Sequence, residues 1–186
     1  RMPRASSYYT DDISDGYGQL AADARTAAIT EGYSVDNYQF FVVAFKYISF
    51  SPAWAGLGTI GQASGYNFSV SWLNGYSMDS RVFAHELGHN LGMWHAASWD
   101  PTSITQADDS SGTHVEYGND FDVMGNTWNY SLTKIPFTVH YKNLLDWVLD
   151  TNIKSVTGNY SGRIYAADRT QLTGRNYAIR VDSNRD

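Results

Sequence analysis

The chain has 186 residues, of which 42% are hydrophobic and 17% charged, and its formal net charge is −6. This length and balance fit one globular domain, or one domain with a small appendage, and the acidic charge argues against nucleic acid as a partner. Cysteine is absent, which excludes disulfides, thiolate metal ligands and a cysteine nucleophile.

The first part of the chain is predicted to form one helix followed by three strands. Apolar and small side chains recur at helical spacing over residues 17–31, and Gly32 stands where that helix would end. Residues 39–45 are a continuous apolar and aromatic run, which predicts a buried strand. The short, glycine-rich segment 56–62 predicts an edge strand that another backbone can approach closely. Residues 67–72 alternate apolar and polar side chains, which predicts a half-buried strand.

A second helix is predicted to run through Val82 to about Leu91, capped by Ser77 or Asp79. This helix carries the first part of the pattern H-E-x-x-H-x-x-G-x-x-H, whose fixed positions are His85, Glu86, His89, Gly92 and His95. The first two imidazoles are four residues apart, so they project from one face of a helix and can bind one ion. The glycine permits a sharp helix end, after which the chain can turn back and deliver the third imidazole.

Three protein ligands leave a fourth position for water, which distinguishes a catalytic zinc site from a closed structural one. Glu86 can reach that water without ligating the ion. We therefore predict a hydrolytic site in which His85, His89 and His95 hold one Zn²⁺ and Glu86 is catalytic. Three of the five histidines fall at the required offsets, which disfavours a chance match. The competing interpretation is a degenerate homologue that keeps the metal ligands and has lost catalytic activity.

The second part of the chain is less regular. Residues 96–119 are polar and without periodicity, which favours a solvated loop, and no calcium-liganding register appears, so Ca²⁺ is an unsupported cofactor. Residues 135–148 predict a second core helix that starts at Pro136. Residues 163–166 and 177–181 resemble two strands joined by a turn. We therefore divide the chain into a catalytic domain, residues 1–150, and a β-rich tail, residues 151–186, that we expect to begin a further domain.

The extended histidine motif resembles the zinc signature of the metzincin metallopeptidases. Members of that clan share a methionine-containing turn beneath the metal, and the segment D-V-M-G offers Met124 for it. Together with the preceding E-Y-G and with H-A-A-S-W at residues 95–99, these segments are similar to gametolysin-like and related bacterial secreted metallopeptidases. The resemblance covers roughly residues 56–148.

The resemblance implies an α+β fold, namely a twisted, mixed five-stranded sheet with an active-site helix and a C-terminal helix, to which the small C-terminal β appendage is added. It also implies that the edge strand, at Gly58, Thr59 and Ile60, pairs with an extended protein or peptide substrate. Some metzincins carry a tyrosine two residues after the turn methionine, where this chain has Asn126. Tyr130 is the candidate for that role and for substrate binding, although a role in the core or the pocket wall is favoured.

The predicted function is a zinc-dependent endopeptidase in which Glu86, as general base, activates a zinc-bound water. Two alternatives stay open: a zinc hydrolase of a non-protein amide such as peptidoglycan, and a non-catalytic binding module with the same fold. The resemblance implies a secreted, extracellular protein, although the polar start of this chain contains no signal peptide. We expect a monomer without a membrane span, because no apolar stretch approaches the roughly 20 residues required.

Overall fold

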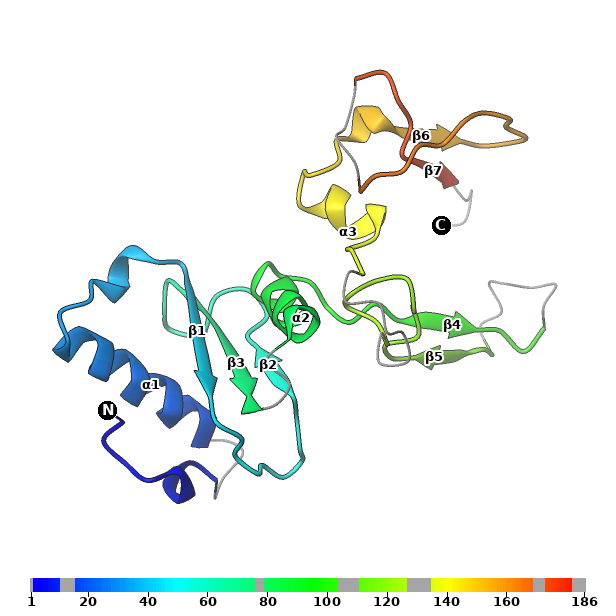
Figure 1. The fold of residues 1–186 in the computed structure, drawn as a ribbon. Coiled ribbons are helices and arrows are strands. Elements are labelled where there is room, and N and C mark those ends of the chain that lie inside the picture. Colours follow the sequence, from blue (N-terminus) through cyan, green and yellow to red (C-terminus); the bar gives the residue numbers. More distant parts are fainter. Residues whose placement is uncertain are drawn as a thin grey trace.

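The computed structural model describes residues 2–10, 16–75, 79–103, 111–126, 135–168 and 173–181. Within these ranges it confirms the α+β class (Figure 1). The helices are α1 (Gly16–Thr30), α2 (Ser80–Asn90) and α3 (Val139–Leu144), with short 3-10 turns η1 (Ser6–Tyr9), η2 (Val35–Asn37) and η4 (Asp150–Asn152). The strands are β1 (Phe40–Phe45), β2 (Gly56–Gly58), β3 (Ser69–Asn74), β4 (Ser98–Asp100), β5 (Thr113–Val115), β6 (Ile153–Val156) and β7 (Ala178–Val181).

The strand β3 is the centre of the sheet that positions the site. The order is β1-β3-β2, with β1 parallel and β2 antiparallel to β3, and Figure 1 shows α1 and α2 on opposite sides of this sheet. Every residue of β3 is buried, so the prediction of a half-buried strand is wrong. The reason is that its polar side chains also meet a partner: Ser71 Oγ donates a hydrogen bond to Asn90 Oδ1 of α2 over 2.7 Å.

Two apolar side chains of β3 face α1 and form part of the larger core. Val70 and Trp72 pack there with Leu20 and Ala21 of α1, and the Trp72 indole N–H donates to the Tyr17 carbonyl over 2.8 Å. The helix ends as predicted, because Gly32 follows it with a φ of 89°. The helical pattern and its stop signal are therefore confirmed.

Two predictions about this sheet need correction. The described residues form a three-stranded sheet, not a five-stranded one, because β4 and β5 pair with each other in a separate hairpin. The run at 39–45 forms β1, but as an edge strand with Phe40 40% and Val42 39% exposed, rather than as a buried one. An apolar run indicates a strand but not how many neighbours it has. The edge position expected for the glycine-rich segment is confirmed for β2.

The C-terminal part is α+β as expected, but its elements differ in extent. The helix α3 begins after Thr138 and ends at Leu144, so it is shorter than predicted and does not start at Pro136. Leu144 is 63% exposed rather than in the core. Residues 163–166 form no strand; β7 instead pairs in parallel with β6. The short apolar run at 164–166 is therefore not the partner of β7; the partner is β6, which lies earlier in the chain. No described helix is long and apolar enough to cross a bilayer.

Candidate metal centre and its cleft

Helix α2 places the first two histidines, and local signals in the sequence fix both of its ends. The Asp79 carboxylate caps the N-terminus by accepting a hydrogen bond from the Val82 N–H over 2.8 Å, as predicted for one of the two candidate caps. At the other end, Gly92 has a φ of 91° and the Met93 N–H bonds back to the Gly88 carbonyl over 3.0 Å. This left-handed cap turns the chain sharply, which returns His95 to the face of the helix.

The three predicted ligands come together. One ring nitrogen from each of His85, His89 and His95 lies within 4.8 Å of the others, and His89 Nε2 lies 3.2 Å from His95 Nε2. Zinc binds imidazole nitrogen at about 2.0–2.1 Å in tetrahedral geometry, which separates two ligand atoms by roughly 3.3 Å. The His89 and His95 nitrogens have this separation, and imidazole nitrogens are donors that suit zinc.

Each imidazole is also oriented through its other nitrogen. His85 Nδ1 donates to the Val123 carbonyl and His89 Nδ1 to the Met93 carbonyl, both over 2.8 Å. A carbonyl can only accept, so these nitrogens carry the hydrogen and each Nε2 keeps its lone pair for a metal. Burial lowers the pKa of His85 to about 4 and also lowers the pKa of His89. Both rings are thereby held in the neutral form that binds metals.

The third histidine is oriented by a carboxylate. His95 Nδ1 lies 2.5 Å from Glu116 Oε1, and the Tyr117 ring packs on the imidazole with 3.7 Å between ring centroids. Tyr117 has a φ of 61° and so sits in the left-handed region. Burial and then the carboxylates of Glu116 and Glu86 raise the pKa of the Tyr117 phenol. Neither residue is predicted from the sequence to have a role at the site, because Glu116 is 21 positions from its histidine and only the E-Y-G resemblance points to the two residues.

Met124 lies fully buried beneath the helix that carries the histidines. A Cβ on Gly88 would overlap its sulfur, so this glycine is required for the close approach. Asp122, also fully buried, holds the segment in place by accepting hydrogen bonds from the N–H groups of Met124 (2.8 Å) and Thr138 (2.7 Å). The backbone of this segment also supplies the Val123 carbonyl that orients His85. The same segment therefore positions both Met124 and His85.

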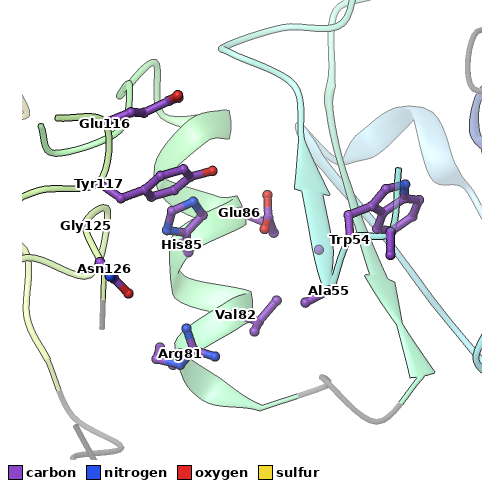
Figure 2. A pocket seen from close by; sticks show the side chains of 12 residues that line it. Trp54, Ala55, Arg81, Val82, His85, Glu86, Glu116, Tyr117, Gly125 and Asn126 are labelled. Carbon is purple, nitrogen blue, oxygen red and sulfur yellow. The ribbon is translucent and has the colours of Figure 1, made fainter. Parts of the chain in front are cut away.

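Glu86 is only 5% exposed and, like His85, lines a cavity of about 660 Å³. Burial raises the pKa of its carboxyl to about 8. The cavity is lined by residues of the β2 end, of α2 and of the segment around Met124, including Gly56, Arg81, His85, Tyr117 and Asn126 (Figure 2). A Cβ on Gly56 would overlap the Glu86 carboxylate and lie 2.7 Å from Val82 Cγ1. The absence of a side chain there leaves room for the carboxylate.

Three of the four predicted substrate-binding residues, Gly58, Thr59 and Ile60, are described by the structure, and none of them is among the residues that line this cavity. A Cβ on Gly58 would meet the Glu86 carbonyl at 2.7 Å and His89 Cβ at 3.0 Å, so this residue packs directly on α2. The Thr59 hydroxyl donates to the Gly61 carbonyl over 2.8 Å, and Ile60 is 39% exposed. Tyr130 lies outside the described residues. The substrate-binding role of all four residues stays a prediction.

A family model described as Metallo-peptidase family M12B Reprolysin-like matches residues 3–96, just over half of the chain. The chain belongs to this family. The match spans the three-stranded sheet, α2 and the three histidines of the candidate metal centre, and ends one residue beyond His95. No curated protein and no solved structure matches the chain.

Proposed function

We propose that this reprolysin-like metallopeptidase is a zinc-dependent endopeptidase of the metzincin type. One observation carries the proposal: three imidazoles, each hydrogen-bonded through Nδ1, present ligand atoms within 4.8 Å of one another beside the buried carboxylate of Glu86. A structural zinc site would use a fourth protein ligand, whereas the described His, Cys, Asp and Glu residues supply three. The cluster also borders a cavity large enough to admit a substrate.

Zinc held by His85, His89 and His95 would polarise the scissile carbonyl and make a bound water more acidic. The carboxylate of Glu86 accepts the proton of the attacking water and returns it to the leaving amine. The missing side chain at Gly56 leaves room for this carboxylate. Tyr117 lines the same cavity, and Figure 2 shows that its hydroxyl points toward Glu86.

The narrower assignment is to the gametolysin-like secreted metallopeptidases. It is supported by the D-V-M-G segment, in which Met124 is buried beneath Gly88 as a metzincin turn methionine would be. The preceding E-Y-G provides the two residues that contact His95. We propose that residues 1–150 are the catalytic domain, that the protein acts outside the cell, and that it acts as a monomer.

We further propose that the substrate binds in extended form along β2. This strand lies at the edge of the three-stranded sheet, and its first residue, Gly56, borders the cavity that contains Glu86. An extended peptide that adds to such an edge is bound through its backbone, which tolerates many sequences. In this arrangement Gly58, which packs on α2 beside His89, Thr59 and Ile60 continue the binding surface beyond Gly56.

The test is cleavage of a mixed peptide library, read by mass spectrometry, by the zinc-loaded protein and its Glu86→Gln variant. The exposed Glu31, at the end of α1, provides the matched control Glu31→Gln. We expect cuts from the wild type and the control and none from Glu86→Gln. If folded, zinc-loaded wild type makes no cuts, the endopeptidase proposal is wrong, and peptidoglycan amides are the next substrates to assay.

A further inference from the structure

The side chain of Tyr117 borders both the metal ligands and the proposed general base. It lines the cavity together with His85 and Glu86, and Figure 2 shows its hydroxyl pointing toward Glu86. Its ring packs on the imidazole of His95 with 3.7 Å between the ring centroids, and it is stacked over His85 at 5.9 Å. The hydroxyl is therefore directed into the part of the cavity where the reaction would take place.

The backbone at Tyr117 has a conformation that is costly for an aromatic residue. Its φ of 61° lies in the left-handed region, which bulky L-residues rarely occupy. Two hydrogen bonds fix the backbone there: the Gly118 N–H donates to the Val115 carbonyl over 3.1 Å, and the Asn126 N–H donates to the Tyr117 carbonyl over 2.6 Å. Strained backbone of this kind clusters at active sites, where it preorganises side chains. Glycine would avoid the cost, so the presence of tyrosine indicates a role for the side chain.

The proposed hydrolysis generates negative charge on the oxygen of the scissile carbonyl. The water oxygen bonds to the carbonyl carbon while a water proton passes to Glu86, and the π electron pair of the carbonyl moves onto its oxygen. The pair returns when the C–N bond breaks and the proton passes from Glu86 to the leaving nitrogen. A hydrogen-bond donor aimed at this oxygen stabilises the charge as it forms, and such stabilisation is usually the largest single contribution to catalysis.

We propose that the Tyr117 hydroxyl donates a hydrogen bond to the oxygen of the scissile carbonyl as this charge forms. The carbonyl has to lie beside the metal ligands and within reach of the water that Glu86 deprotonates. Tyr117 borders both places, because its ring lies on His95 and its hydroxyl points toward Glu86. A phenol is protonated at neutral pH, so it can donate, and it keeps its proton throughout the step. This inference rests on the proposed peptidase function and adds a catalytic residue to it.

The first test measures peptide cleavage by Tyr117→Phe, which removes the hydroxyl and keeps the ring that packs on His95. The control is Tyr33→Phe, at a tyrosine that is 69% exposed, and zinc content and a thermal melt show that each protein is loaded and folded. For Tyr117→Phe we expect kcat to fall about hundredfold and KM to change by less than about twofold, because the hydrogen bond strengthens in the transition state. A kcat within about twofold of the wild type, or a loss in KM alone, overturns the inference.

Binding of a transition-state analogue gives a readout that does not need turnover. A phosphinic peptide places a tetrahedral phosphorus with charged oxygens where the substrate has its scissile carbonyl. Titrated into the zinc-loaded proteins, it should bind Tyr117→Phe about hundredfold more weakly than the wild type. The uncleaved peptide, titrated into Glu86→Gln with and without Tyr117→Phe, should keep its affinity within about twofold. Equal affinities of the wild type and Tyr117→Phe for the analogue overturn the inference.

A second pair of titrations tests whether Tyr117 acts only by orienting Glu86. In the Glu86→Ala background, which lacks that carboxylate, Tyr117→Phe should weaken binding of the analogue by about the same factor as in the wild type. If the effect disappears in this background, Tyr117 acts through Glu86 and the inference is overturned. A wild type that neither cleaves peptides nor binds the analogue overturns the peptidase proposal and this inference together. A wild type that does both, matched by Tyr117→Phe, overturns this inference alone.

Discussion

Glu86 should make the metal-free protein less stable as the pH rises, and Glu86→Gln should remove this effect. Burial raises the pKa of its carboxyl from 4.5 to about 8. Between these values the folded chain holds a proton that the unfolded chain has lost, so the free energy of unfolding decreases with pH. Its stabilising effect is complete below about pH 4.5 and is lost as the pH approaches 8. Each pH unit is worth about 1.4 kcal/mol.

The unfolding free energy of the variant, relative to that of the wild type, should therefore increase from low pH to pH 5 by less than about 1 kcal/mol. From low pH to pH 8 it should increase by roughly 4 kcal/mol. His85, whose pKa burial lowers to about 4, has the opposite pH dependence below pH 6.5. Since it is present in both proteins, its contribution cancels in the difference. The assay is urea unfolding of both proteins at pH 5, 6.5 and 8 in the presence of a chelator. A difference in unfolding free energy that stays constant over this range would show that the carboxyl of Glu86 does not titrate with a raised pKa in the folded protein.

Three further predictions concern the metal ligands and the floor beneath them. Glu116→Gln, which weakens the hydrogen bond to His95 Nδ1, should lower zinc affinity about ten- to a hundredfold. A competition assay with a chromogenic chelator measures this affinity, and an unchanged value would mean that the carboxylate does not contribute to zinc binding. Gly88→Ala should lower the urea midpoint, because the overlap of the new Cβ with Met124 costs about 1–3 kcal/mol. This cost outweighs the gain in helix propensity of about 1 kcal/mol. A raised midpoint would show that Met124 moves aside without cost. In the wild type, zinc should raise the melting temperature, and His89→Ala should abolish that rise, which a scan with and without zinc measures.

The parts of the site that were predictable from sequence depend on local signals. The cap at Asp79, the helix after it and the left-handed end at Gly92 each follow from a residue within a few positions. The convergence of His85, His89 and His95 follows from the same geometry, since a helix of known length and a sharp end fix where three side chains point. These predictions are confirmed by the structure.

The parts that were not predictable depend on contacts between distant segments. The carboxylate of Glu116 reaches His95 from a separate hairpin, and no spacing rule connects the two. The full burial of β3 depends on the hydrogen bond between Ser71 and Asn90. This bond forms only because α2 packs on the sheet, which the sequence of β3 alone does not indicate. The number of strands and the pairing of β6 with β7 likewise depend on which edges meet, and an apolar pattern within one strand does not contain that information.

The most direct test of the central claim is to measure zinc content and peptide cleavage on the same samples of wild type and Glu86→Gln. We expect one zinc ion per chain in both proteins and cleavage by the wild type alone. The central claim would be contradicted by a folded wild type that binds no zinc, or by a Glu86→Gln variant that cleaves as fast as the wild type.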